Sequence, residues 1–215
     1  MSQKHDSIIA REGYIFIIVA ALLTLIAFAF TPCWVAFILL LVTAFIVWFF
    51  RNPERNTPPG EKLIISPADG EVIKIEEVRE HEIMAGPLRK ISIFMNVFSV
   101  HVNRIPCTGR IEAVHYYKGK FLSANLDKAS SDNERNGLVI RMDDGREIGM
   151  IQVAGLVARR IVCWVSEGMR VEKGQRFGLI RFGSRVEVLL PADTAVMVET
   201  GDKVRAGETP IGGLS

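Results

Sequence analysis

The sequence predicts a mainly β protein, an antiparallel barrel or sandwich, that is preceded by a helical hairpin in a membrane. Two long uncharged apolar runs lie near the N-terminus, and the rest of the chain consists of short β-rich runs separated by turn signals. One glycine-containing pattern in this β-rich part occurs twice. The 215 residues suffice for one core of ordinary size and an appendage.

Composition excludes several classes of function. A net charge of +2 gives no support to nucleic-acid binding. The three cysteines form neither a CxxC motif nor a cluster with histidine, which argues against a disulfide framework and against a zinc site. The four histidines are also scattered along the chain, so we expect no metal centre.

The first 50 residues predict a membrane hairpin. Tyr14–Phe30 and Trp34–Phe50 are uncharged runs separated only by Thr31–Cys33. As helices, each would span about 26 Å, slightly short of the roughly 30 Å of a hydrocarbon core. A signal peptide is the alternative, because basic residues precede the first run, but it does not account for the second run.

Basic residues precede and follow the predicted hairpin, whereas the short connection between its two helices carries no charge. Lys4 and Arg11 precede it, and Arg51, Arg55 and Lys62 follow it. By the positive-inside tendency, we expect a protein of the cell membrane whose termini and following domain lie on the cytoplasmic side.

Residues 51–62 carry three prolines and predict a linker or collar. Residues 63–215 predict the β domain, whose turns include Asp69-Gly70 and Asp144-Gly145. The expected β-rich runs are residues 70–78, 89–105, 109–117, 136–142, 146–165, 175–183 and 185–190. We interpret "LIRFGSRVEVLLP" (179–191) as one strand with an apolar face, in which Ser184 is an unexpected polar residue that follows a glycine.

An internal repeat refines the predicted architecture. "GMRVEKGQRFGLI" (168–180) recurs as "GDKVRAGETPIGG" (201–213), an offset of 33 residues. The pattern resembles the quasi-symmetric hammerhead, or barrel-sandwich, of biotinyl and lipoyl carrier domains. Residues 184–200 lack the lysine that carries the prosthetic group in those domains, so the resemblance implies the sheet architecture without the carrier chemistry.

Three segments contain candidate functional residues, and each also has an ordinary structural reading. "SPADGEV" (66–72) is typical of a turn. In "FMNVFSVHVNRIP" (94–106), alternation predicts Ser99, His101 and Asn103 on one strand face. A histidine at such a position can be a hydrogen-bonded structural residue as readily as a functional one. The pair Gly183-Ser184 by itself signals little.

In combination, these motifs resemble the phosphatidylserine decarboxylases, in their short proteobacterial and archaeal form. The resemblance covers the hairpin and seven motifs in order: "FFRNPER" (49–55), "SPADG" (66–70), "VHVNRIP" (100–106), "GKFLSAN" (119–125), "NERN" (133–136), "QVAG" (152–155) and "RFGSRV" (181–186). Members of this family are made as proenzymes and cut themselves at a Gly-Ser bond.

The resemblance implies self-cleavage between Gly183 and Ser184. The Ser184 hydroxyl would attack the Gly183 carbonyl, and β-elimination and hydrolysis would leave a pyruvoyl group on an α chain of residues 184–215, with residues 1–183 as the β chain. This covalent pyruvate, the only cofactor implied, would form a Schiff base with phosphatidylserine and release CO2 to give phosphatidylethanolamine. The partners implied are therefore phosphatidylserine in the membrane and the two chains of one precursor, with a homodimer as a further candidate.

The family pattern also implies roles for other residues. Asp69 matches the aspartate that assists self-cleavage, and we expect His101 to be the acid/base. Arg104 stands where many members have a second histidine, so either His101 serves both steps or the base for Ser184 is supplied differently. Because arginine stays protonated, we expect Arg104, with Asn103, to contact the substrate headgroup.

The sequence is compatible with three alternatives. The chain could be a membrane-anchored barrel-sandwich scaffold whose Gly183–Ser184 bond stays intact. It could apply the same pyruvoyl chemistry to a soluble amino acid, although a membrane hairpin has no evident purpose there. It could also act on an ether-linked phosphoserine lipid.

Overall fold

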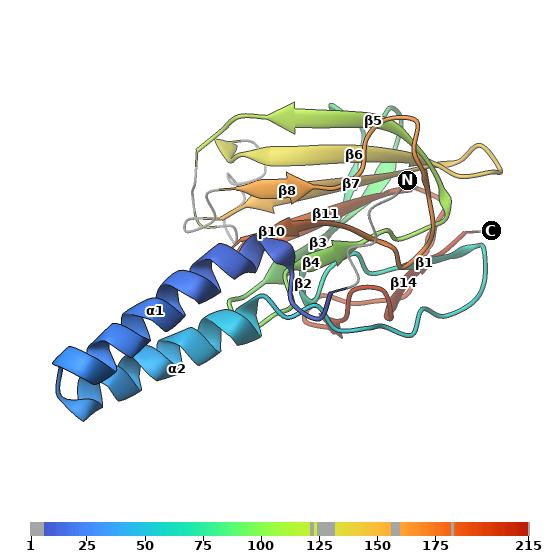
Figure 1. Ribbon diagram of the computed structural model, residues 1–215. Helices are drawn as coiled ribbons and strands as arrows, with labels where there is room; N and C mark the ends of the chain where they lie inside the picture. Colours follow the sequence, from blue (N-terminus) through green and yellow to red (C-terminus); the bar gives the residue numbers. More distant parts are fainter. Residues whose placement is uncertain (1–6, 121–122, 124–131, 156–159, 182, 215) are drawn as a thin grey trace. The chain divides into compact units, whose positions relative to one another are not determined.

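The computed structural model describes residues 7–120, 123, 132–155, 160–181 and 183–214 (Figure 1). The chain divides into two units, Met1–Glu54 and Arg55–Ser215. The first is a pair of helices and the second consists of antiparallel sheets. The predicted fold class, mainly β with an N-terminal helix pair, is confirmed.

The N-terminal unit is an antiparallel helix pair. A short 3-10 helix, Arg11–Gly13, leads into α1 (Tyr14–Phe30), and α2 (Cys33–Phe49) follows after a sharp turn. The hydroxyls of Thr24 and Thr43 lie 2.9 Å apart between the helices. Among the described residues, one helical segment, Arg11–Phe30, has the length and apolar composition to cross a membrane, whereas α2 is shorter at 17 residues. This finding suggests membrane association, and the side of the membrane stays a prediction.

Backbone hydrogen bonds join the two ends of the helix pair. The Ala10 N–H donates to the Phe50 carbonyl at 2.8 Å, and the Asn52 N–H donates to the Ile8 carbonyl at 2.7 Å. The Asn52 side-chain amide adds a bond to the Ser7 carbonyl at 2.8 Å. The asparagine of the "FFRNPER" motif therefore closes the base of the hairpin.

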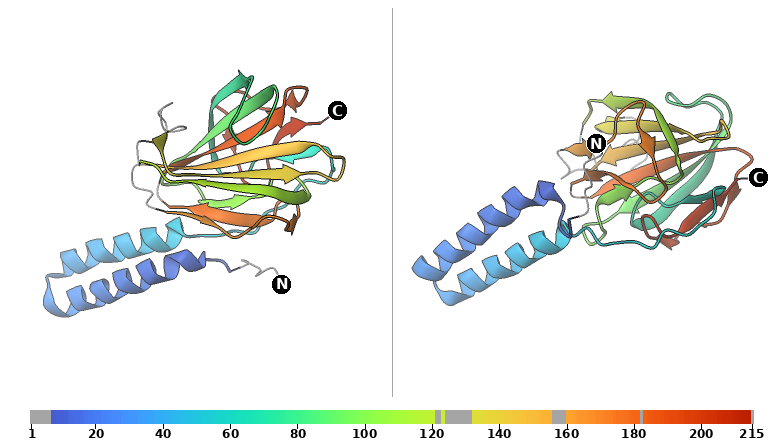
Figure 2. Two further views of the ribbon diagram at one scale, coloured as in Figure 1. Left: turned by 90° about the horizontal axis from the view of Figure 1, so that it is seen from above. Right: turned by 45° about the vertical axis from the view of Figure 1, so that its right-hand side comes forward.

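The second unit is built on a curled antiparallel sheet of eight strands (Figures 1 and 2). Each strand pairs with a neighbour along most of its length, and all pairings are antiparallel. In spatial order the strands are β13 (Lys203–Val204), β2 (Gly70–Val78), β3 (Leu88–Met95), β11 (Ser184–Pro191), β7 (Glu147–Ala154), β6 (Arg135–Arg141), β5 (Gly109–Tyr117) and β9 (Arg170–Val171).

Two three-stranded sheets complete this unit. Their strands, in spatial order, are β4 (Val102–Arg104), β10 (Arg176–Ile180) and β8 (Ile161–Cys163) in one sheet, and β1 (Leu63–Ile65), β14 (Pro210–Gly213) and β12 (Ala195–Val196) in the other. Apolar residues of both small sheets, such as Phe177 and Ile211, share one buried cluster with Val186 and Val188 of β11. The main core therefore lies between the large sheet and the two small ones.

The sequence repeat corresponds to a structural repeat. β9 and β13 are equivalent short strands that close opposite edges of the large sheet. Each is followed by the central strand of a small sheet, β10 or β14. The glycines at equivalent positions, Gly168 with Gly201 and Gly174 with Gly207, all have φ between 80° and 100°, the left-handed region that favours glycine. The repeat thus gives the unit approximate internal symmetry.

The prediction of one strand over 179–191 is wrong. β10 ends at Ile180 in a small sheet, and β11 begins at Ser184 in the large one. Gly183 lies between them with φ +61°, a conformation that a regular strand cannot contain. The chain therefore changes sheets immediately before Ser184.

The run 89–105 is also divided, so the predicted shared face of Ser99, His101 and Asn103 is wrong as well. β3 ends at Met95, and a turn follows in which the Asn96 side chain accepts the Phe98 N–H at 2.8 Å. Such side-chain-to-backbone bonds compete with strand pairing. Ser99 lies in this turn, and His101 directly precedes β4.

Candidate active site

Ser184 is fully buried at the first position of β11, in the middle of the large sheet. Its paired residues are Met95 of β3 and Ala154 of β7. The Ser184 hydroxyl donates to the Met95 sulfur, with the two atoms 3.5 Å apart. Because the preceding Gly183 is left-handed, the bond between the two residues lies at a sharp change of backbone direction.

His101 is also fully buried, and its backbone lies beside the strand that leads to Ser184. Its carbonyl accepts the Ile180 N–H at 3.4 Å, directly beyond the pairing of β4 with β10. In the side chain, Nδ1 lies 3.0 Å from the Ser99 carbonyl oxygen. A carbonyl only accepts, so Nδ1 carries the proton, and in the neutral ring Nε2 carries the basic lone pair.

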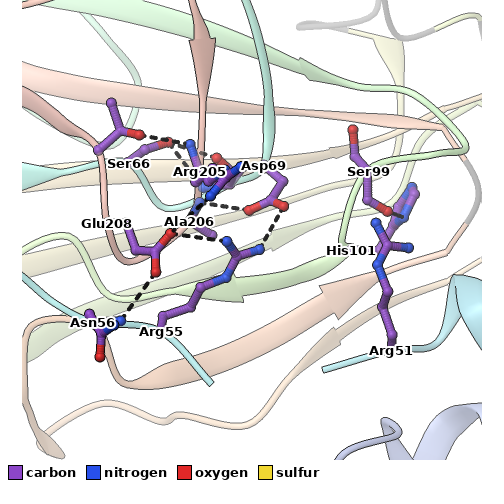
Figure 3. Close-up of polar contacts among 12 residues, drawn as sticks. Arg51, Arg55, Asn56, Ser66, Asp69, Ser99, His101, Arg205, Ala206 and Glu208 are labelled. Carbon is purple, nitrogen blue, oxygen red and sulfur yellow. Dashed lines mark hydrogen bonds and ion pairs between the residues drawn. The ribbon is translucent and has the colours of Figure 1, made fainter. Parts of the chain in front are cut away.

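Asp69 lies in the turn between β1 and β2, where both carboxylate oxygens are bound (Figure 3). Oδ1 accepts the Ala206 N–H at 2.7 Å, and Oδ2 accepts a bond from the Arg55 guanidinium at 2.8 Å. Ala206 lies in the turn after β13, so Asp69 connects the "SPADG" turn to the second copy of the repeat.

Arg55 joins Asp69 to a second carboxylate. Its Nη1 donates to Glu208 at 3.1 Å, and Glu208 also accepts the Asn56 N–H at 3.2 Å. Partial burial acts to raise the pKa of Glu208, but the bonds from Asn56 and Arg55 outweigh it and lower that pKa. Asp69 therefore belongs to a partly buried cluster of two carboxylates around one guanidinium.

The structure brings the predicted site residues together only in part. His101 is tied to the strand that precedes Ser184. In Figure 3 the Asp69 carboxylate faces Arg55 and Ala206, whereas the His101 ring lies with Ser99. The roles assigned to Asp69, His101 and Ser184 in self-cleavage stay predictions.

Arg104 and Asn103, the expected headgroup contacts, are buried residues of β4. The Arg104 guanidinium donates to the Gly174 carbonyl at 2.8 Å, and the Arg104 N–H donates to the Pro67 carbonyl at 2.9 Å. β4 is thereby fixed both to the "SPADG" turn and to the first copy of the repeat. Contact of Arg104 and Asn103 with a headgroup stays a prediction.

Several residues around this site were not proposed as functional from the sequence. They are Arg55 and Glu208 beside Asp69, Met95 beside Ser184, and Gln152 and Asn136, of which Gln152 donates to Asn103 Oδ1 at 2.8 Å and accepts from Asn136 at 3.1 Å. Three of them lie in motifs that carry the family resemblance, namely "FFRNPER", "NERN" and "QVAG". Those motifs could have indicated functional residues, but their contacts are long-range and cannot be inferred from spacing. Most of the "GKFLSAN" motif lies outside the described residues.

Within the described residues, the cysteines are poor candidate nucleophiles and the metal-ligating side chains are poorly placed to bind a metal ion. Burial raises the pKa of Cys107 to about 12 and also raises that of Cys163, so both thiols are weak nucleophiles. No group of three or more histidine, cysteine, aspartate or glutamate side chains is arranged there to hold a metal ion.

Comparison with known proteins agrees with the motifs. The family model described as phosphatidylserine decarboxylase matches residues 42–212. The chain is 59% identical over 210 residues to the phosphatidylserine decarboxylase proenzyme of Syntrophus aciditrophicus, covering 97% of this chain and 99% of that protein. It is 50% identical to the proenzyme of Desulfotalea psychrophila, covering 95% of each chain, and 45% identical to that of Magnetococcus marinus, covering 98% and 97%. The chain belongs to the phosphatidylserine decarboxylase family.

Proposed function

We propose that this chain is a phosphatidylserine decarboxylase proenzyme that cuts itself between Gly183 and Ser184. The observation that carries the proposal is the position of Ser184, a fully buried hydroxyl at the start of a central strand, directly after a left-handed glycine. This position is where the family resemblance requires the cleaved bond.

The cleavage requires only this chain and one water molecule. Ser184 Oγ attacks the Gly183 carbonyl carbon, the C–N bond breaks, and the Ser184 nitrogen takes up the proton. Loss of the Ser184 α-proton then breaks the Cβ–Oγ bond, so that Gly183 leaves as a carboxylate that retains this oxygen. The dehydroalanine that remains adds water and releases ammonia, which leaves a pyruvoyl group on the 184–215 chain.

Three features of the fold support this reaction. A Cβ built at Gly183 meets no atom within 4 Å, so this position favours glycine because of its left-handed backbone conformation and not because of crowding. Burial of Ser184 keeps bulk water from the intermediate ester. After cleavage, β11 remains paired along its length with β3 and along most of its length with β7, so the two chains stay together.

A pyruvoyl group at position 184 would supply an electrophilic carbonyl for the substrate amine and an acceptor for the electrons left when CO2 departs. We propose that His101 moves protons through Nε2, because Nδ1 is engaged by the Ser99 carbonyl. The apolar hairpin would hold this site at a lipid surface, and its basic flanks favour the cytoplasmic side.

His101→Ala is expected to slow both self-cleavage and decarboxylation by about 100-fold or more, as for loss of a general acid/base. His115→Ala is the matched control, because His115 lies on β5 and outside the site. The rate of chain cleavage and the release of CO2 measure the two steps. A His101→Ala protein with both rates at the wild-type level would exclude His101 as the acid/base.

Intact-mass spectrometry of the purified full-length chain tests the proposed function. Two fragments that separate at Gly183/Ser184 are expected, with the smaller one lighter by one ammonia than a peptide that begins with serine. A single folded chain of 24.0 kDa would contradict the proposal and favour the membrane-anchored scaffold. Assays with diacyl and ether phosphatidylserine then distinguish the two lipid classes.

A further inference from the structure

Three buried amide side chains form a row between the large sheet and the small sheet that contains β4. Asn136 of β6 donates through Nδ2 to Gln152 Oε1 at 3.1 Å, and Gln152 of β7 donates through Nε2 to Asn103 Oδ1 at 2.8 Å. All three residues are at most 2% exposed. Polar groups this deeply buried are usually retained for a structural or functional reason.

Met95 connects the last amide of the row, Asn103, to the proposed nucleophile Ser184. Asn103 Nδ2 lies 3.6 Å from the Met95 sulfur, and Ser184 Oγ lies 3.5 Å from the same sulfur. Met95 is fully buried. A chain of contacts therefore runs from Asn136 to the Ser184 hydroxyl.

The direction of these hydrogen bonds is fixed by the chemistry of the amides. Because the Met95 thioether has no proton to donate, Asn103 presents its NH2 to the sulfur and its oxygen to Gln152. Gln152 therefore donates to Asn103 through Nε2 and accepts from Asn136 through Oε1. A thioether accepts weakly and takes up no proton. The sulfur therefore orients the Ser184 hydroxyl without acting as its base, and the proton passes to the Ser184 nitrogen when Oγ attacks, as in the proposed cleavage.

The strand pairings place the three amides near Ser184 and near the backbone of His101. Gln152 is paired with Val186 of β11, one alternation from Ser184 on the same face. Asn103 is paired with Gly178 of β10, and the hydrogen bond of the His101 carbonyl lies directly beyond this pairing. A Cβ at Gly178 would clash first with the Val162 carbonyl oxygen and would lie 3.0 Å from Gln152 Nε2, so the glycine accommodates both the neighbouring strand and this amide.

We propose that Asn103, Gln152 and Asn136 are positioning residues for self-cleavage. They fix β4 against β7, the strand that pairs with β11, and, through Met95, set the direction of the Ser184 hydroxyl. The inference rests on the proposed self-cleavage and adds to it a set of residues that act before the pyruvoyl group exists.

Gln152→Met tests this role, since it removes the amide and retains a side chain of similar length. We expect self-cleavage of freshly translated full-length protein to slow by about tenfold or more, because small displacements of a reacting group are costly. A misaligned ester also loses its α-proton more slowly and is exposed to water for longer. Hydrolysis of that ester leaves Ser184 intact, so the fraction of 184–215 chains that begin with serine should rise, as measured by intact mass.

Met95→Leu removes the sulfur that contacts both Ser184 Oγ and Asn103 Nδ2, while the hydrogen bonds between the three amides stay in place. We expect it to slow cleavage by about threefold and to raise the serine-started fraction. Met150→Leu, on the same strand and face as Gln152, is the matched control and should leave both measurements unchanged. A purely structural role would change the melting temperature without changing the ratio of pyruvoyl to serine.

Wild-type rates and wild-type pyruvoyl fractions in both Gln152→Met and Met95→Leu would overturn the inference. If Gln152→Met does not fold, Met95→Leu decides, since it is close to volume-conserving. An uncut wild-type chain would instead contradict the proposed function itself.

Discussion

Ser184→Ala is expected to give a single uncut chain with no decarboxylase activity. The substitution removes the attacking oxygen, which Ser184 holds at the first position of β11. It should leave the fold intact, because the hydroxyl has a weak sulfur acceptor and its loss costs about 1 kcal/mol. The melting temperature should therefore fall by only about 2–4 °C.

Ser92→Ala is the matched control, since Ser92 is also a buried strand serine but lies on β3, opposite Glu187. It should cleave like the wild-type protein. Intact mass and CO2 release measure both variants. Two fragments from Ser184→Ala would show that another group cuts the chain and would remove Ser184 from the mechanism.

Asp69→Asn is expected to slow self-cleavage by about 100-fold or more if the carboxylate has a chemical role. The change keeps the size of the side chain and an oxygen that can accept the Ala206 N–H. It removes the negative charge beside Arg55, so a neutral amide then faces the guanidinium. Cleavage is followed as the disappearance of the full-length chain.

Glu208→Gln separates this chemical role from a structural one. Glu208 binds the same guanidinium, so its loss perturbs Arg55 in a similar way, while it leaves the Asp69 carboxylate in place. We expect cleavage by Glu208→Gln to stay within about threefold of the wild-type rate, with a stability loss of about 1–3 kcal/mol. Equal slowing in the two variants would show that Asp69 acts only by holding Arg55.

Many local elements could be predicted from the sequence because their signals are local. Alternation and flanking turns gave the bounds of β2 and β5, and uncharged runs gave the two helices to within a residue. The glycine pattern located both copies of the repeat, whose left-handed turns only glycine adopts readily. The Gly183–Ser184 bond was also found from the sequence, through the family motifs rather than through its strand pattern.

Only the tertiary structure decided how these elements meet. Alternation describes which face a residue takes and carries no information about which sheet receives the strand, so the change of sheet at Gly183 was missed. Asp69 finds its partner Ala206 across 137 positions of sequence, and Gln152 reaches Asn103 across 49. The sequence by itself determined the helices, many of the strands, the repeat and the bond proposed to be cut. The folded sheets decided which buried polar groups surround that bond, because such contacts depend on strand order and packing between layers.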